Sequence, residues 1–417
     1  QLANTYADVL ASSDDPETIV EVGKRQARVY ELELGDVERA VASYLFVLKR
    51  NRTERESLEN LDRIYSEHGA HEALAATLAT RVEATEDGTE KVQISCRLGQ
   101  VLENELGRID ESVKVYQGLL ANLDPEHEES LKALQNIYTE KQDWQALFAT
   151  FRKEMEVVMG DTARADVTAK MAYVSSAYLG EPEQAIAAWK EVLDLRGEDP
   201  EALNALGNIY ASLSRWAELV EILDREVTVA ESDESRVAIF TDMARAFYTR
   251  IGKVQNAIDS WERVLDIDPT SANALFGLAE IHRHAERWQE LADTLNRVIE
   301  VGAATLDDQT LETVYMQLAT LYEFTLEQPM EAVDAYTRAL DVNMYNFAAI
   351  DSLERIHRRD GEWVDAIRII ERRYQATQEP SQRVAVLLAI AEAWQVHAEQ
   401  PDHGTSAYER VLEIEPV

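Results

Sequence analysis

The sequence is poor in cysteine, proline and glycine, and each shortage excludes a class of protein. Its 417 residues include one cysteine, Cys96, so the chain cannot hold an internal disulfide framework. The 9 prolines and 16 glycines are too few for long flexible linkers between domains. No apolar run approaches the roughly 20 residues that a helix needs to span a bilayer. The lone cysteine fits a reducing compartment without establishing one.

Basic residues are also in short supply. The chain has 41 Lys and Arg against 78 Asp and Glu, which gives a formal net charge of −37. The excess of acid is spread over the whole chain and is not confined to a tail. Such a field repels nucleic acid and anionic membranes and favours basic partners. The same charge could instead serve solubility or belong to a halophile-type surface.

Sequence motifs that carry catalysis are missing. The chain has no Walker-type phosphate loop, no GxSxG elbow, no HExxH pair and no pair of cysteines. Cys96 has no histidine at a useful local spacing, and we expect His282 to be a packing residue and His284 a groove or surface residue. We therefore predict that the chain is not an enzyme. We assign no catalytic, cofactor-binding or metal-ligating residue and expect no cofactor.

What the chain does contain is a repeat. An aromatic residue returns at intervals of 72, 73, 72, 75 and 72 residues, at Tyr44, Tyr116, Trp189, Trp261, Tyr336 and Tyr408. A second series lies between these positions, at His71, Trp144, Trp216, Trp288 and Trp363. Self-similarity at a fixed period indicates an array in which each unit packs mainly on its neighbours. We interpret the periodic tryptophans as packing residues and not as a cofactor or carbohydrate site.

Each period contains two similar halves, and each half has the pattern of a helical hairpin. In residues 236–269, apolar residues recur at helical spacing until Gly252, which lies in a short polar turn. A second amphipathic stretch follows and ends at Pro269. The companion half, residues 200–232, has two similar stretches joined by a turn that is one residue shorter.

These halves resemble tetratricopeptide repeats. The family's positions are matched in residues 200–232 by Leu206-Gly207, Tyr210 and Trp216, and in residues 236–269 by Ala257, Trp261 and Pro269. The second kind carries one extra residue between Thr249 and Lys253, and the first kind lacks the final proline. The resemblance implies an all-α fold, an α-solenoid of stacked helix–turn–helix hairpins forming a right-handed superhelix whose first helices line the concave face.

We expect residues 1–417 to form a single solenoid of this kind. Long-turn hairpins are predicted near 19–52, 91–124, 164–197, 236–269, 311–344 and 383–416. Companion hairpins are predicted near 53–86, 127–161, 200–232, 272–304 and 347–380, after a partial unit at 1–14. The chain starts inside a repeat and stops at the end of another without a polar capping helix. We therefore expect it to be a section of a longer array.

The resemblance also indicates where a partner would bind. Its first-helix register places many residues on the concave surface, among them Arg63, Cys96, Arg283, His284 and Arg355. Seven residues of this surface are the candidate partner-binding residues: Lys132, Asn136, Tyr173, Asn204, Asn208, Arg245 and Tyr248. Asn can hydrogen-bond the backbone of an extended peptide, and Tyr supplies adaptable contact area. Lys132 and Asn136 stand where carboxylate-gripping members of the family place Lys and Asn, but Lys170 and Ala205 do not continue that pattern. The predicted function is a non-enzymatic scaffold that binds a protein segment or peptide, with a basic partner favoured.

Other functions stay open at the level of sequence. The array could be an architectural spacer or a self-assembling rod within a very large protein, or the regulator of an enzyme domain outside this chain. An RNA-processing scaffold fits less well because the chain is acidic, and nucleic acid is not the expected partner. A phosphate or nucleic-acid site is a minor alternative at the one basic concentration, Arg355, Arg358, Arg359, Arg368, Arg372 and Arg373. Interleaved acids are expected to neutralise much of it.

Overall fold

The computed structural model describes residues 2–302 and 305–415, and every regular element in these ranges is helical. This confirms the predicted all-α fold. Two compact units can be distinguished, Gln1–Ile209 and Tyr210–Val417. None of the described helices is long and apolar enough to cross a membrane. Residues 1, 304 and 416, at which predicted hairpin units begin or end, lie outside the described residues.

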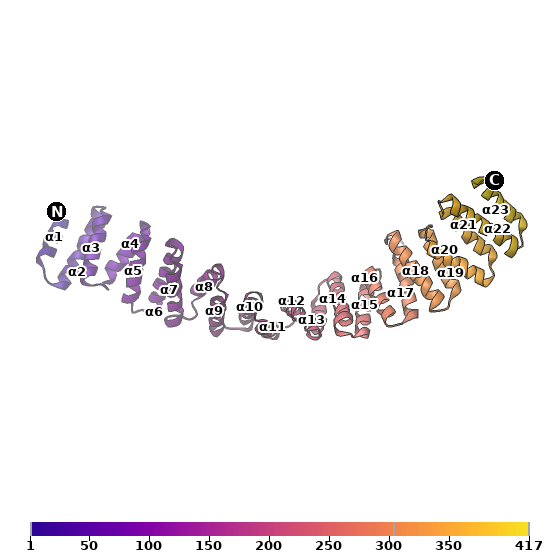
Figure 1. Ribbon diagram of the computed structural model, residues 1–417. Coiled ribbons are helices and arrows are strands. Elements are labelled where there is room, and N and C mark those ends of the chain that lie inside the picture. Colours follow the sequence, from indigo (N-terminus) through magenta and orange to yellow (C-terminus); the bar gives the residue numbers. More distant parts are fainter. Residues whose placement is uncertain (1, 303–304, 416–417) are drawn as a thin grey trace. The chain divides into compact units, whose positions relative to one another are not determined.

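The first unit is a row of helical hairpins in chain order (Figure 1). Its helices are α1 (Leu2–Ser12), α2 (Pro16–Arg28), α3 (Val37–Arg50), α4 (Arg55–Glu67), α5 (His71–Ala84), α6 (Gly88–Gln100), α7 (Ile109–Asn122), α8 (Glu128–Glu140), α9 (Trp144–Val157), α10 (Asp161–Val174), α11 (Pro182–Arg196) and most of α12 (Pro200–Ser212). The even-numbered helices are the first helices of their hairpins, and those from α2 to α10 each also contact the second helix of the preceding one.

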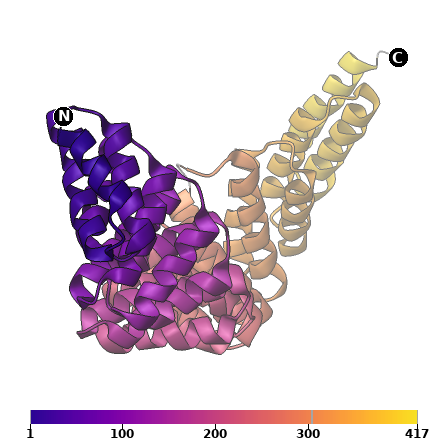
Figure 2. The same cartoon turned by 90° about the vertical axis from the view of Figure 1, so that its left-hand side faces the viewer.

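The second unit continues the same pattern, and Figure 2 shows the paired helices of its last hairpin, α22 and α23, side by side. Its helices are α13 (Trp216–Val229), α14 (Asp233–Ala246), α15 (Val254–Ile267), α16 (Ala272–His284), α17 (Trp288–Gly302), α18 (Asp308–Phe324), α19 (Pro329–Val342), α20 (Phe347–Asp360), α21 (Trp363–Ala376), α22 (Pro380–Glu392) and α23 (Pro401–Ile414). The right-handed superhelix stays a prediction of the resemblance.

A π-helical turn ends the first helix of five long-turn hairpins. These turns are η1 (Val29–Glu33), η2 (Val101–Glu105), η3 (Ser175–Leu179), η4 (Phe247–Ile251) and η5 (Ala393–His397). A π turn takes up one extra residue within a helix. Lys253 N–H accordingly donates to Phe247 O (2.9 Å), whereas in a companion hairpin Arg215 N–H reaches Tyr210 O (2.8 Å), one residue nearer in sequence. The extra residue predicted between Thr249 and Lys253 is thus accommodated by the end of a widened helix.

Each turn between the two helices of a described hairpin contains one residue with positive φ. Glycine occupies this position at Gly35, Gly69, Gly107, Gly180, Gly252 and Gly361, and other residues occupy it at Gln142, Ser214, Glu286, Glu327 and Glu399. The left-handed conformation costs an L-residue roughly 1–2 kcal/mol and costs glycine almost nothing. The five non-glycine turns therefore hold backbone strain.

We expect Glu286→Gly to raise the free energy of unfolding by about 0.5–1 kcal/mol. The substitution relieves the strain of a φ of 54°, and the greater freedom of glycine in the unfolded chain offsets part of the gain. Gly252→Ala is the matched control, because an added Cβ would meet no atom within 4 Å and the change acts through the backbone alone. It should lower stability by about 1 kcal/mol. Urea unfolding followed by circular dichroism measures both; the same sign for both variants would contradict the assignment.

The first aromatic series lies in the core. Tyr44, Tyr116, Trp189, Trp261 and Tyr336 are at most 4% exposed. The Trp261 ring in α15 covers Gly277 in the next hairpin, where an added Cβ would lie 2.5 Å from Trp261 Cε2. The packing role predicted for these residues is confirmed. Tyr408 in α23, the last described helix, is the exception and is 39% exposed.

The second aromatic series joins one hairpin to the next. Its residues begin the second helices of companion hairpins, and four of them contact a side chain in the following π turn. The pairs are His71 with Glu105 (Nε2–Oε2 3.5 Å), Trp144 with Tyr178 (stacked, 3.7 Å), Trp216 with Arg250 (cation over ring, 5.1 Å) and Trp363 with His397 (stacked, 3.8 Å). The contact is kept while its chemistry changes, which confirms that these tryptophans serve packing.

Candidate functional site

The candidate groove residues of the first unit lie on its first helices. Lys132 and Asn136 lie on α8, Tyr173 on α10, and Asn204 and Asn208 on α12, and all five are exposed. We call the exposed side of these helices the first-helix surface of the unit. Lys132 forms an ion pair with Glu128 one turn earlier, and the Asn208 amide donates to Asn204 Oδ1 (2.9 Å). Tyr173 is 55% exposed and is therefore available for contact.

In the second unit, Arg245 on α14 is exposed and Tyr248 in η4 is half-buried. The Tyr248 ring lies 6.5 Å from the ring of His284, at the end of α16. Burial, and less strongly the Glu280 carboxylate, raise the pKa of Tyr248. Tyr248 is therefore a neutral hydroxyl at physiological pH, able both to donate and to accept a hydrogen bond. The contact with His284 connects this first-helix surface to the next hairpin.

Between α16 and α18 the first-helix surface of the second unit is hollowed into a groove. Its lining includes Phe276, Glu280, Arg283, His284, Thr313 and Gln317. Phe276 is 37% exposed, and Arg283 donates to Gln317 Oε1 (2.7 Å) across the groove. The groove thus combines an accessible aromatic ring, both signs of charge and an amide.

Sequence reasoning identified part of this groove. Arg283 and His284 follow from the family register, and His284 is exposed as expected, while His282 is buried, as expected for a packing residue. Phe276 was missed, although it lies two residues before Leu278, as Asn204 lies two residues before Leu206. The lengthened interval of 75 residues between Trp261 and Tyr336 is a further signal, because the groove falls within it.

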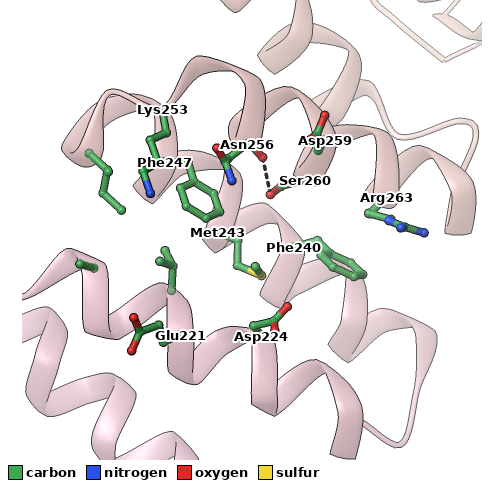
Figure 3. Close-up of a pocket in the computed structure, with 13 residues that line it drawn as sticks. Glu221, Asp224, Phe240, Met243, Phe247, Lys253, Asn256, Asp259, Ser260 and Arg263 are labelled. Carbon is green, nitrogen blue, oxygen red and sulfur yellow. Dashed lines mark hydrogen bonds between the residues drawn. The ribbon is translucent and has the colours of Figure 1, made fainter.

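A different hollow lies between the second helices α13 and α15 (Figure 3). Met243 of α14 and Phe247 of η4 form its apolar floor, Glu221 and Asp224 line it from α13, and Arg263 lines it from α15. Similar hollows recur beside α18, lined by Tyr315 and Tyr322, and beside α2, lined by Tyr30 and Phe46. All three belong to long-turn hairpins, so this hollow is a feature of the repeat. Nothing in the sequence analysis anticipated it.

The six clustered arginines between Arg355 and Arg373 are all paired with acids. The ion pairs are Arg355 with Glu323, Arg358 with Glu354, Arg359 with Asp360, Arg368 with Asp365, Arg372 with Asp341, and Arg373 with Asp351 and Glu354. Neutralisation by acids was the expectation, and it is confirmed. A phosphate group would have to compete with these carboxylates for every arginine.

Buried tyrosines organise a second set of ion pairs. The Tyr336 hydroxyl donates to Glu323 (3.0 Å), whose side chain is only 3% exposed and which also pairs with Arg355 of the next hairpin. Burial raises the pKa of Tyr336 to about 12, so the hydroxyl keeps its proton at neutral pH. The same arrangement recurs at Tyr44, Glu31 and Arg63. Arg63 and Arg355, which the family register assigns to the groove, therefore also hold neighbouring hairpins together.

Cys96 is buried, at 5% exposure, although the family register places it on the groove. Its Sγ lies 3.4 Å from Glu129 Oε2 of the next hairpin. Burial, followed by the Glu129 carboxylate, raises the pKa of the Cys96 thiol to about 12. The unligated sulfur is therefore a protonated thiol at neutral pH and a poor nucleophile.

These observations define the class of protein: an all-α solenoid of helical hairpins whose first helices present a polar and aromatic surface. Models of the tetratricopeptide repeat match residues 175–234, 241–305 and 349–384. The chain therefore contains tetratricopeptide repeats in these ranges. A comparison with curated proteins finds no match.

The solved structures that match this chain have low sequence identity to it. The C-terminal part of a TPR repeat-containing protein from Cytophaga hutchinsonii is 15% identical, with 62% of this chain and 99% of that chain covered and a TM-score of 0.36. YrrB, described as a TPR protein with an unusual peptide-binding site, is 15% identical, with 45% and 91% covered and a TM-score of 0.30. MamA is 20% identical, with 44% and 93% covered and a TM-score of 0.28.

Proposed function

We propose that this chain is a non-enzymatic scaffold that binds an extended protein segment on its first-helix surfaces. The observation that carries the proposal is the groove between α16 and α18, where Phe276 is accessible beside Arg283 and Gln317. An exposed ring supplies contact area at little cost in conformational entropy, and polar groups beside it can bind a peptide backbone. In the first unit, Tyr173 and the Asn204–Asn208 pair offer the same combination on the first-helix surface.

A basic segment is the partner that the charge favours. The net charge of −37 attracts cationic chains and accelerates their encounter with the protein. Within the groove, Glu280 offers a carboxylate to a cation of the segment. The paired state of the six arginines supports a protein partner over a nucleic acid, because phosphates would have to displace their acids.

Selection of phage-displayed random peptides on the purified protein tests this function. We expect enriched sequences that combine Lys or Arg with an apolar residue. Their binding should weaken at least tenfold in Phe276→Ala, because a buried aromatic anchor typically contributes more than about 1.4 kcal/mol. Met330→Ala is the matched control, since Met330 is 77% exposed but lines the hollow beside α18. Absence of enrichment, or loss of binding in the control alone, would contradict the proposal.

A further inference from the structure

Three different metal-binding side chains meet between the second long-turn hairpin of the first unit and the companion hairpin that follows it. Cys96 comes from α6, His127 is the N-cap residue of α8, and Glu129 lies in the first turn of α8. One ligand atom from each lies within 4.8 Å of the other two. The histidine was not apparent from local spacing, because it belongs to the next hairpin.

In the preceding repeat period, between α2 and α4, ion pairs occupy the position equivalent to this cluster. Lys24 Nζ lies 3.5 Å from Glu54 and 3.1 Å from Glu56, and Arg28 also pairs with Glu56. These residues lie on α2 and at the start of α4. Two cations from one hairpin thus neutralise two carboxylates of the next.

The backbone fixes the correspondence between the two periods. The π turns begin at Val29 and Val101, so Lys24 corresponds to Cys96 and Arg28 to Gln100. The N-cap residues are Glu54 and His127, which accept from the backbone N–H of the serine three residues later. Glu56 therefore corresponds to Glu129, which keeps its carboxylate.

In the period that contains Cys96, the positions of these cations are occupied by uncharged residues, one of which is a cysteine that can bind a metal. Lys24 and Arg28 are replaced by Cys96 and Gln100, and Arg63, which neutralises Glu31, is replaced by Asn136. The corresponding acids Glu103 and Glu129 remain. Within residues 2–302 and 305–415, no Lys or Arg lies within ion-pair distance of Glu103 or Glu129. The neighbouring period supplies three cations, Lys24, Arg28 and Arg63, whereas the two remaining carboxylates here have none.

We propose that Cys96 Sγ, a ring nitrogen of His127 and a carboxylate oxygen of Glu129 bind a zinc ion that takes the place of Lys24 and Arg28. Sulfur, imidazole nitrogen and carboxylate oxygen together suit zinc, whereas magnesium and calcium prefer oxygen alone. On binding, the Cys96 thiol releases its proton to solvent and forms the sulfur–zinc bond as a thiolate. Water completes the tetrahedral coordination that three protein ligands leave open.

The groups around the three ligands suit this role. His127 Nδ1 lies 3.0 Å from Ser130 Oγ. When the ring proton sits on Nδ1, it donates to Ser130 Oγ and no longer accepts from the Ser130 backbone N–H, and Nε2 then carries the lone pair for the metal. Such an outer hydrogen-bond partner is usual for a metal-bound histidine. The Gln100 amide lies 3.7 Å from Cys96 Sγ and donates to it. The ion would tie α6 to α8 and so fix one hairpin on the next, beside Lys132 and Asn136.

Zinc titration tests the site. The tag-free chain is first freed of metal with a chelator and dialysed, and zinc is then added in the presence of a chromophoric chelator that competes with the protein for the ion. We expect one equivalent to bind with micromolar or tighter affinity and to raise the midpoint of thermal unfolding. Cobalt(II) should give the thiolate-to-metal charge-transfer band of a Cys ligand. Cys96→Ser and His127→Asn should each weaken zinc binding at least tenfold and abolish the cobalt band. His127→Asn keeps an N-cap acceptor and should remain folded by circular dichroism.

His71→Asn is the matched control, because His71 lies 3.5 Å from a single carboxylate, that of Glu105. This substitution should leave zinc binding at Cys96, His127 and Glu129 unchanged. Zinc binding that is equal in Cys96→Ser and in the unaltered chain would mean that surface acids bind the ion, and would overturn the proposal. So would the absence of any stoichiometric binding at micromolar zinc. The outcome is independent of peptide binding at the first-helix surfaces.

Discussion

Trp261→Ala is expected to lower the free energy of unfolding by about 3–5 kcal/mol, the usual loss for a large buried aromatic residue. Trp261 is 4% exposed and fills the space between α15 and α16. In a repeat array, stability depends on the interfaces between neighbours, so losing one interface also uncouples the hairpins on either side of it. Urea unfolding should therefore show a lower midpoint and a broader transition. Trp363→Ala, which removes a half-buried ring stacked on His397, should cost less.

A second substitution tests whether the loss comes from this interface. Gly277→Ala alone should cost about 1–3 kcal/mol, because the new Cβ would lie 2.5 Å from Trp261 Cε2. Trp261→Leu empties that space. In this background, Gly277→Ala should leave the free energy of unfolding unchanged or raise it. The two changes are then strongly non-additive. Additive losses would contradict the direct packing of Trp261 on Gly277.

Arg355→Ala is expected to lower the free energy of unfolding by about 2 kcal/mol. The substitution leaves the Glu323 carboxylate, which is 3% exposed, with the Tyr336 hydroxyl and without a cation. Breaking a fully buried pair costs roughly 3–5 kcal/mol, and the effect is smaller here because Arg355 itself is 49% exposed. Chemical unfolding followed by circular dichroism gives the value.

Arg368→Ala provides the comparison for this prediction. Arg368 pairs with Asp365 at 2.8 Å, but the two side chains are 75% and 45% exposed. Surface pairs of this kind contribute about 0–1 kcal/mol. Equal losses in Arg355→Ala and Arg368→Ala would show that the buried carboxylate is not the cause. A full recovery in Glu323→Gln combined with Arg355→Ala would support the proposed cause.

The regular part of this fold could be predicted from sequence because burial repeats with the chain. Tyr44, Tyr116 and Tyr336 fall at one period and are fully buried, and the break at Gly252 coincides with a turn. The π turns could not be predicted, because one extra residue between Thr249 and Lys253 can extend a loop or widen a helix. Only the backbone hydrogen bond from Lys253 to Phe247 distinguishes the two.

The chemistry between hairpins was harder to predict than the helices. Family register assigns Arg63 and Arg355 to the groove, but it does not reveal that a carboxylate from the preceding hairpin pairs with each. Cys96 and His127 are far apart in sequence and meet only because α6 and α8 belong to consecutive first helices. A comparison of equivalent positions across periods could have found both, since Glu31 and Glu103 recur while Arg63 becomes Asn136.

The most direct test of a binding function is calorimetric titration of one selected peptide into three proteins: the unaltered chain, Phe276→Ala and Met330→Ala. The groove between α16 and α18 predicts that affinity falls at least tenfold in Phe276→Ala and stays unchanged in Met330→Ala. Equal affinity for all three proteins, with both variants folded, would contradict the assignment of binding to the first-helix surface.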